Sequence, residues 1–448
     1  MISPENVIKI KELLSNQKEQ SAIEFLEQFQ PIDLAALIEH LDRTEQYQVV
    51  SILSTKITAE ALEYMPPEQQ YHILVHIDEL KTSSIINDMS SDVVADMLLA
   101  LHRHQTFRLL NLLQADYRKK VETLMTFPEF TAGSLATVDY ISARIYWSVE
   151  QTLVHIRKVG RDAEITSYVY VTGHMGDLIG VVSLKEIILA DPQMKLSEIV
   201  SEDPIRVPAQ LAQEQAAEIL SKYDFVALPV VDEQQRLIGV ITVDDVIDVI
   251  TEEATEDIQK LGGSEPLTEP YFKTTIFQLY RKRIVWLLVL FVAEAYTGFV
   301  MKNFSGVLSQ VIYLSFFIPL LIGTGGNTGT QIVTTLVRAL AVGEVRFKDI
   351  FKVIRKEFST GLAIGVTLSV IAFLKSELLG VPIEIGLIVA LTAMCIVIWA
   401  SLVAGILPLI LHACKADPAV VSGPMITTLV DGTGLIIYFS IAKWVLGL

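Results

Sequence analysis

The sequence predicts a multidomain membrane protein with an all-α helical N-terminal domain, a duplicated α/β region and an α-helical membrane domain that crosses the bilayer five times. Hydrophobic residues make up 51% of the 448 residues, a larger share than ordinary soluble domains have. Long uncharged runs gather after residue 283. The charge also differs between the two parts of the chain. Residues 1–270 contain 21 Lys and Arg against 44 Asp and Glu, whereas the part from Tyr271 onward contains 14 Lys and Arg against 8 Asp and Glu.

This charge balance limits the possible partners and the compartment. An acidic N-terminal part argues against nucleic acid, whose phosphates need the opposite charge, and it favours contact with cations. Cys395 and Cys414 form neither a disulfide framework nor a CxxC metal pair. The start, MISPENVIKIKELL, is amphipathic and differs from a secretory signal. We therefore expect residues 1–270 to lie in the cytoplasm.

Five apolar runs approach the length of about 20 residues that a helix needs to cross a bilayer. They are 284–300, 304–337, 359–374, 385–411 and 420–446. Connections rich in Lys and Arg stay in the cytoplasm. Three basic residues precede the first run and six lie in the connection between the second and third runs. This pattern predicts cytoplasmic N-terminal domains and a C-terminus outside the cell.

Asp431 is the one acid in the last apolar run and lies near its middle. A charged side chain at the bilayer centre costs about 2.5–3.5 kcal/mol on insertion scales, so such acids usually serve ions, protons or contacts within a helix bundle. The alternative is a protonated or Lys-paired helix contact, although Lys443 is far along the same helix. Glu294, in the first run, is the other titratable group that a proton-coupled pathway would use.

Residues 1–131 show a series of short helices, each with a polar cap followed by apolar residues at three- and four-residue spacing. The segments IDLAALIEHL and SSDVVADMLLALHRH show this pattern. Its repetition predicts a small helical superhelix. No Ser/His/Asp or Cys/His set appears in the sequence, so we do not expect an enzyme.

An internal duplication lies between residues 135 and 257. Residues 178–187, LIGVVSLKEI, match residues 237–246, LIGVITVDDV. Each copy follows a β-type run with a polar turn and leads into a helix, and the segment ALPVVDEQQRLIGVITVDDVIDVI closely resembles a CBS domain; the first copy lacks the usual proline. We expect CBS domains at 135–198 and 199–257. The resemblance implies either a regulatory pair that often binds adenine nucleotides or a dimerisation scaffold with an empty cleft.

A strongly acidic helix is expected from Asp244, within a connecting segment at 244–270. At 100° per residue, four of its acids form one stripe: Asp245, Asp248, Glu252 and Glu256. Like charges four residues apart destabilise a helix by roughly 0.2–0.5 kcal/mol per pair, which favours cations between them. The alternative is an ordinary solvated helix face. Because LGGSEPLTEP leads from this helix to the first apolar run, the helix is well placed to act as a gate.

Glycines cluster in the second apolar run, in the segment GTGGNTG at 323–329. This segment is not a phosphate-binding P-loop, since it has no Lys and no preceding soluble strand. Small residues let membrane helices approach one another closely. We therefore predict that these glycines serve helix packing rather than direct ion contact.

Three segments together strongly resemble the MgtE magnesium channels. They are VDDVIDVITEEATEDIQKLGG, PLLIGTGGNTGTQ and DPAVVSGPMITTLVDGTGLIIYF, in this order. The resemblance extends over the whole chain, with a helical N domain, two CBS domains, a connecting (plug) helix and five spans over 271–448.

The resemblance implies a homodimer with a pore on its two-fold axis, where Asp431 and its symmetry mate select Mg²⁺. It also implies regulatory Mg²⁺ sites in the cytoplasmic part. The matching residues are Asp245, Asp248, Glu253, Glu256 and Asp257 in the connecting helix, Asp92 and Asp96 in the N domain, and Glu214 and Asp224 in the second CBS copy. Phe225 matches a position that stacks adenine, which makes ATP a candidate ligand of the CBS domains.

The function expected from these features is a Mg²⁺-selective channel in the cell (inner, plasma) membrane. It would admit magnesium down its electrochemical gradient and close when cytoplasmic Mg²⁺ occupies the acidic sites. The expected partners are a second copy of the chain, membrane lipid and Mg²⁺. The alternative is a proton-coupled divalent cation transporter. An intramembrane aspartyl protease would need two aspartates in the spans, and the sequence has one.

Overall fold

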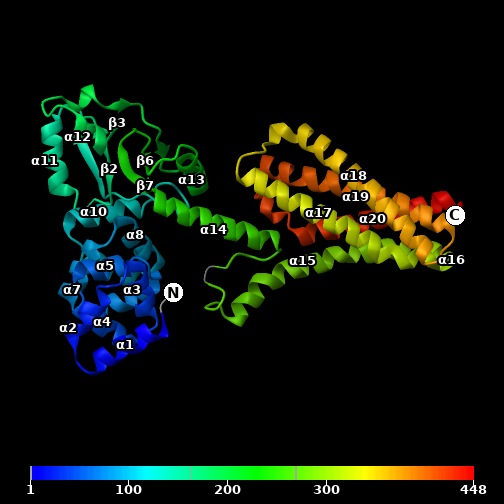
Figure 1. Ribbon diagram of the computed structural model, residues 1–448, viewed down its shortest axis with the longest axis horizontal. Coiled ribbons are helices and arrows are strands. Elements are labelled where there is room, and N and C mark those ends of the chain that lie inside the picture. The colour runs from blue at the N-terminus through cyan, green and yellow to red at the C-terminus, as the bar shows by residue number, and fades with distance from the viewer. Residues whose placement is uncertain (1–2, 162, 268–269) are drawn as a thin grey trace. The chain divides into compact units, whose positions relative to one another are not determined.

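The computed structural model describes residues 3–161, 163–267 and 270–448 (Figure 1). The chain divides into two compact units, Met1–Ile250 and Thr251–Leu448. The division falls inside one helix, α14 (Val243–Leu261), so the first turns of this acidic helix belong to one unit and its last turns to the other.

The first unit begins with a run of short helices, as the sequence predicts. They are α1 (Pro4–Ser15), α2 (Glu19–Leu26), α3 (Pro31–Glu39), α4 (Arg43–Ile52), α5 (Thr55–Leu62), α6 (Pro67–Leu74), α7 (Glu79–Asp88), α8 (Ser91–Ala100), α9 (Arg103–Leu110) and α10 (Ala115–Leu124). Caps set their starts: Asp42 accepts from the Glu45 amide at 2.9 Å while the Glu45 side chain accepts from the Asp42 amide. Their buried apolar faces form one continuous core.

Two small sheets follow, with the same strand arrangement in each. The first has the order β1-β2-β3-β4 and the second β5-β6-β7, and in each the first pair is parallel and the second antiparallel. The strands are β1 (Tyr140–Arg144), β2 (Ile165–Thr172), β3 (Leu178–Ser183), β4 (Ser201–Glu202), β5 (Val207–Pro208), β6 (Ala227–Val231) and β7 (Leu237–Thr242). The helices of this region are α11 (Val149–Val159), α12 (Leu184–Leu189), η1 (Leu196–Glu198) and α13 (Gln213–Lys222). The duplication is confirmed.

Both copies have a glycine at the same position, and the structure requires it for the same reason in each. A Cβ atom at Gly239 would lie 2.6 Å from the carbonyl oxygen of Thr137, and one at Gly180 would clash with the carbonyl oxygen of Ser201. Another backbone segment therefore passes close to each strand at this point, which only glycine allows. The two polar turns also pair with each other, since the Leu237 amide donates to the Gly176 carbonyl at 3.1 Å.

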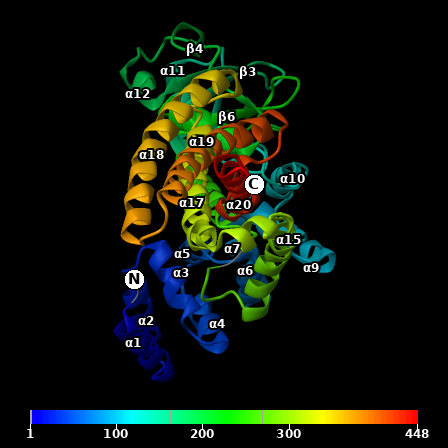
Figure 2. The ribbon, with the colours of Figure 1, turned by 90° about the vertical axis from the view of Figure 1, so that its right-hand side faces the viewer.

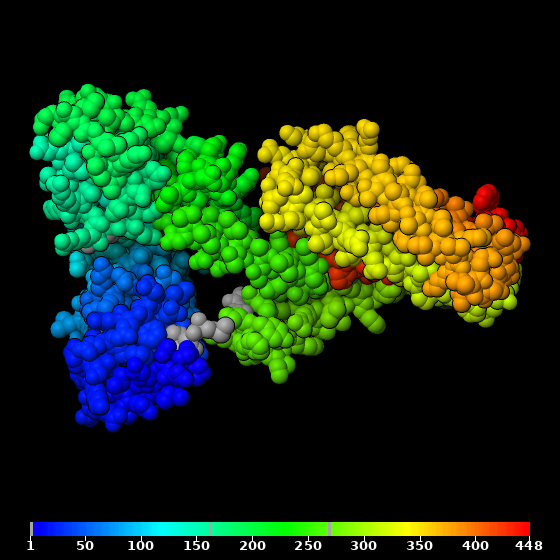
Figure 3. All heavy atoms as spheres, viewed as in Figure 1, coloured from blue at the N-terminus to red at the C-terminus, as the bar shows by residue number. Residues whose placement is uncertain are grey.

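The second unit is a helical bundle. Its elements are α15 (Ile276–Asn303), α16 (Ser305–Gln310), η2 (Ile312–Phe317), α17 (Ile318–Ala341), η3 (Phe347–Asp349), α18 (Ile350–Leu378), α19 (Ile383–Ala413), η4 (Pro418–Val420) and α20 (Gly423–Leu446). In α19 and α20, 50% of the most apolar 18-residue stretch of each helix is buried within the protein. In the segment that contains α18 the share is 17%, so α18 lies on the surface of the bundle (Figures 2 and 3).

Within the described residues, four helical segments are long and apolar enough to cross a membrane: Ile276–Asn303, Phe347–Leu378, Ile383–Ala413 and Gly423–Leu446. The expected second span, 304–337, is not one helix. It consists of two short elements followed by α17, which begins beside Pro319 because proline fits the first turn of a helix and not its interior. The 24-residue α17 remains the candidate for the fifth span.

The glycine cluster of α17 is a packing surface, as predicted. A Cβ atom at Gly325 would lie 2.6 Å from Ile396 in α19 and 2.7 Å from Val430 in α20, and one at Gly329 would clash with Ile426 in α20. In contrast, a Cβ atom at Gly323 would meet nothing within 4 Å. The glycines thus let α17 approach two neighbouring helices closely.

We expect Gly325→Ala to destabilise the bundle by about 1–3 kcal/mol, because the added methyl group overpacks a tight helix contact. Gly323→Ala is the matched control: it lies in open space, and alanine favours the helix, so stability should stay equal or rise. Thermal unfolding of the detergent-purified full chain measures both. Equal midpoints for the two variants would contradict the packing role.

Candidate functional site

Asp431 lies in α20 at the place where this helix contacts α17 and α15. Its neighbour Val430 approaches Gly325 of α17, and a Cβ atom at its other neighbour, Gly432, would clash with the Tyr296 ring of α15. Asp431 is 8% exposed, and its Oδ1 atom is buried without a hydrogen-bond partner among the described residues. Such an atom is rare in folded proteins and needs a functional explanation.

The surroundings of Asp431 exclude one alternative for it. Lys443, the proposed partner, places its Nζ atom 5.5 Å from the ring centroid of Phe304. The separation of twelve positions between Asp431 and Lys443 corresponds to about 18 Å along the helix. The Lys-paired interpretation is therefore wrong for this structure.

A second polar group without a partner lies on α15. The Thr297 Oγ1 atom is buried and has no hydrogen-bond partner in the described part of the chain, and it would lie 3.4 Å from a Cβ atom at Gly432. The contact between α15 and α20 thus holds two oxygen atoms that lack donors. Sequence analysis missed Thr297, because a single threonine in an apolar run is an ordinary feature of a membrane helix.

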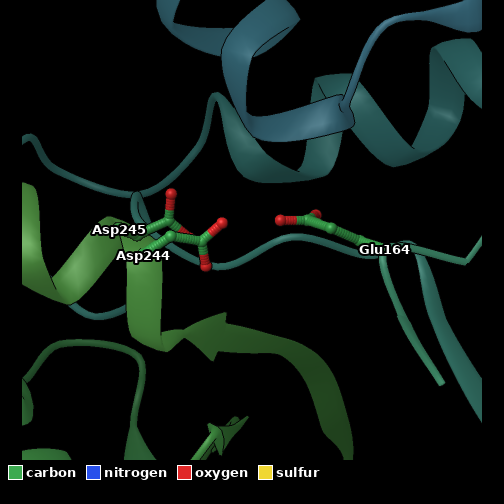
Figure 4. Close-up of side chains that lie close together, drawn as sticks. All are labelled: Glu164, Asp244 and Asp245. Atoms are coloured by element: carbon green, nitrogen blue, oxygen red, sulfur yellow. The ribbon is translucent and has the colours of Figure 1, made fainter. Parts of the chain in front are cut away.

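In the first unit, three carboxylates converge at the start of α14. The Glu164 side chain, just before β2, points toward Asp244 and Asp245 in the first turn of the helix (Figure 4). One oxygen from each lies within 4.8 Å of the others. The Thr242 hydroxyl donates to Asp245 Oδ2 at 2.6 Å and fixes that side chain. The donor set is entirely oxygen, which suits a hard divalent cation.

Asp92 adds negative charge to this cluster. It lies in the first turn of α8, is 9% exposed, and its Oδ1 atom has no hydrogen-bond partner among the described residues. Burial raises the pKa of Asp92 well above its usual range, and the carboxylates of Asp245 and Glu164 raise it further. A group of acids that suppress one another's ionisation in this way is short of positive charge.

The pKa values of the neighbouring acids also indicate that the cluster lacks positive charge. Burial raises the pKa of Asp245 to about 6, and the Asp244 carboxylate contributes to the shift. Desolvation raises the pKa of Glu164 to about 7, with further contributions from Asp245 and Asp244, even though part of the Glu164 side chain meets solvent. A bound divalent cation would reverse these shifts, because an adjacent positive charge favours the ionised form.

The remaining regulatory candidates of the first unit are more dispersed. Asp96 is exposed on α8, one turn after Asp92, and Asp248 is exposed on α14, about one turn after Asp245. Glu214 lies in the first turn of α13, whereas Asp224 lies two residues beyond the end of this helix. Asp224 occupies a left-handed position, with φ of 53°.

Phe225, the candidate adenine-stacking residue, lies directly before β6. Its ring is half-buried and stacks on the Tyr223 ring, with the centroids 5.5 Å apart and the planes within 15° of each other. The structure thus places a pair of parallel aromatic rings at the start of the second sheet.

In the second unit, Lys260 joins the end of α14 to the connection between α19 and α20. Its Nζ atom lies 2.6 Å from Asp417 Oδ2 and also forms an ion pair with Glu256. Partial burial lowers the pKa of Lys260, but the two carboxylates outweigh this effect and raise it overall. One lysine thus provides the positive charge between two acids from different parts of the chain.

Asp257, one of the predicted regulatory residues, lies in the last turns of α14 and is close to the same two charged residues, Asp417 and Lys260. Partial burial raises its pKa, and repulsion from Asp417 adds to the shift, while Lys260 opposes it. The structure therefore brings Glu256 and Asp257 together with Asp417. Glu253 is half-buried one turn earlier on the helix.

Sequence analysis missed Glu164, Asp417 and the role of Lys260. Glu164 comes close to Asp245 only after the first sheet has folded, and Asp417 is 157 positions from Lys260. The one local signal was for Asp417, which precedes Pro418 and caps the short helix η4 by accepting from the Ala419 amide at 2.8 Å.

Comparisons with known proteins bear on the whole chain. A family model described as a divalent cation transporter matches residues 318–441, that of the MgtE intracellular N domain matches 29–130, and that of the CBS domain matches 196–252. The last of these covers the second copy of the duplication, the one with the proline.

Two curated relatives match over nearly their full length. The chain is 39% identical over 442 residues to the magnesium transporter MgtE of Thermus thermophilus, covering 98% of each protein. It is 32% identical over 443 residues to the magnesium transporter MgtE of Bacillus subtilis, covering 99% of this chain and 98% of the relative.

A solved structure resembles the N-terminal half. It is the cytosolic domain of the Mg²⁺ channel MgtE in complex with ATP, which is 36% identical, covers 54% of this chain and 99% of that one, and has a TM-score of 0.52. With its helical N domain, its CBS pair and its apolar helical C-terminal region, the chain belongs to the MgtE family of magnesium transporters.

Proposed function

We propose that the chain forms a homodimeric Mg²⁺ channel of the cell membrane that admits magnesium and closes when cytoplasmic magnesium is plentiful. It is not an enzyme in this proposal. The observation that carries it is the buried Asp431 Oδ1 atom, which receives no hydrogen bond from the described residues in the middle of an apolar helix. The names of the two full-length relatives as magnesium transporters support the choice of ion.

The chemistry of the ion fits a carboxylate on a symmetry axis. Mg²⁺ demands near-octahedral oxygen geometry and gives up its water reluctantly, so a selective site holds a largely hydrated ion. Two Asp431 carboxylates, one from each subunit, would accept hydrogen bonds from that water and balance its charge. The buried oxygens of Thr297 and Asp431 have no hydrogen-bond partner among the described residues and are available as acceptors.

The membrane potential is a sufficient driving force. Moving two positive charges inward through 100 mV releases about 4.6 kcal/mol, which corresponds to roughly three decades of concentration. Uptake by a channel therefore needs no pump, but the channel must close when the cell is replete.

The acidic clusters provide the means of closure. Burial is the main cause of the raised pKa values of Asp92, Asp245 and Glu164, and repulsion from neighbouring carboxylates adds to each shift. Mg²⁺ held there would supply the missing positive charge. At low Mg²⁺, repulsion disfavours the arrangement in which these acids lie close together. At high Mg²⁺, the bound ion removes this repulsion. Because the ion favours only one of the two arrangements, it can shift the population between them.

The placement in the cell and the CBS ligand belong to the same proposal. The basic connections predict cytoplasmic N-terminal domains and an outside C-terminus. ATP is the proposed ligand of the CBS pair, since a relative's cytosolic domain has been solved in complex with ATP and Phe225 stacks on Tyr223 at the start of the second sheet.

Asp431→Asn should lower Mg²⁺ flux at least about tenfold, because the neutral side chain cannot balance the charge of the hydrated ion. The measurement is flux into liposomes that contain the purified full chain. The matched control is Glu384→Gln, which removes an acid at the first turn of α19 and should leave flux unchanged. Undiminished flux in Asp431→Asn would remove the pore assignment.

Glu294→Gln separates a channel from a proton-coupled transporter. A channel should conduct Mg²⁺ without an imposed pH gradient and should keep conducting after this substitution. A transporter that uses Glu294 and Asp431 as a proton pair should depend on the gradient and lose the dependence in the variant. Gradient-dependent flux in the unmodified protein would replace the channel proposal with the transporter.

The double variant Asp248→Asn/Glu256→Gln should stay open at Mg²⁺ concentrations that close the unmodified channel, because two acids of the α14 stripe no longer attract the ion. We expect the half-closing concentration to rise about tenfold or more. The readout is flux against Mg²⁺ on the cytoplasmic face. Unchanged closure would contradict the gating assignment of α14.

Lys260→Met should lower the thermal midpoint at low Mg²⁺ by a few degrees, roughly 1 kcal/mol, because Glu256 and Asp417 would face each other without a cation. Added Mg²⁺ should restore part of the loss. Lys348→Met, at an exposed lysine in the same unit, is the control and should leave the midpoint unchanged. An equal loss at low and high Mg²⁺ would show that the lysine acts only through packing.

A further inference from the structure

A cavity lies where the end of α14, the linker after it and the first turns of α15 meet. It measures about 190 Å³, room for several water molecules or for one phosphate-sized anion. Its lining consists of Gln259, Ser264, Glu265, Leu267, Tyr271, Leu279, Lys282 and Arg283. All of these residues belong to the second unit and are outside the acidic clusters described above.

The lining combines cations with free hydrogen-bond donors. Lys282 is partly neutralised by Glu265, whose carboxylate lies 3.7 Å away, whereas Arg283 is exposed and has no ion-pair partner in the described part of the chain. Gln259 accepts from the Leu267 amide at 2.7 Å through its Oε1 atom, which leaves its NH₂ group available to donate. A guanidinium beside amide donors is the usual chemistry of a phosphate site.

The position of the cavity in the chain points to a lipid. The apolar run of α15 begins at Ile284, directly after Arg283, so the cavity lies at the level of the lipid headgroups. Apolar side chains around it face solvent: Phe272 is 99% exposed, Ile276 87% and Phe277 74%. Exposed aromatic and aliphatic groups next to basic residues are typical of a protein surface at a membrane interface.

We propose that this cavity binds the phosphate of an anionic phospholipid. Arg283 and Lys282 contact the phosphate, and the Gln259 amide donates to it. Leu267 and Leu279 offer apolar surface to the glycerol and the upper acyl chain. Because Gln259 belongs to α14, a bound lipid also fixes the end of the helix that leads into the membrane domain.

Native mass spectrometry of the full chain tests this proposal. The protein is released from detergent with either phosphatidylglycerol or phosphatidylethanolamine of the same acyl chains. We expect retention of phosphatidylglycerol, and a loss of about tenfold or more in Lys282→Gln/Arg283→Gln, since each basic residue near an anionic headgroup contributes about fivefold in affinity. Arg283→Lys keeps the charge and should keep most of the binding.

The matched control is Lys348→Gln/Lys356→Gln. It removes two exposed basic residues near the start of α18, in a connection that is also expected to be cytoplasmic, and does not touch the cavity. Equal loss in the control would show general surface attraction and overturn the site. Retention that is unchanged in the cavity variant would also overturn it. Competition by millimolar inorganic phosphate would identify a free-anion site and reject the lipid.

Discussion

Each unit of this protein buries one carboxylate oxygen that receives no hydrogen bond from the described residues, and the residues packed around that atom must offset the cost of burying it. In the first unit it is Asp92 Oδ1 and in the second Asp431 Oδ1. Burying an ionised carboxylate without a counter-charge costs several kcal/mol, so neither group contributes to stability. The surrounding core must offset that cost, and any cation that reaches the carboxylate recovers part of it.

The two units offset this cost in different ways. Around Asp431, glycines let three helices pack closely, with Gly325 against Val430 and Gly432 against the Tyr296 ring. Dispersion contacts over such an interface are individually small and collectively large. Around Asp92, the offset comes from hydrogen bonds nearby, since the Val138 amide donates to Ser91 Oγ at 3.2 Å and thereby holds the start of α8. Close helix packing thus surrounds Asp431, whereas hydrogen bonds and like charges surround Asp92.

Sequence patterns predicted what depends on local periodicity and repetition. The duplication at 178–187 and 237–246 forms matching strand–helix units, and the glycine cluster of α17 packs as expected. The patterns could not predict Glu164 or Asp417 as neighbours of the acidic helix, because their positions follow from the folding of a sheet and from a contact across 157 positions. The run 304–337 looked continuous because hydrophobicity alone does not register the break before Pro319.

The charge layout of α14 explains why this helix suits a switch. Asp244 and Asp245 lie in its first turn and Lys260 in its last, so both ends agree with the helix dipole. Asp248 and Glu252, in the middle, lie beyond the reach of the dipole at either end, and like charges four residues apart weaken a helix. The division between the two units falls between Ile250 and Thr251. The boundary between the two units therefore lies in the part of the helix where the dipole does not offset the negative charges.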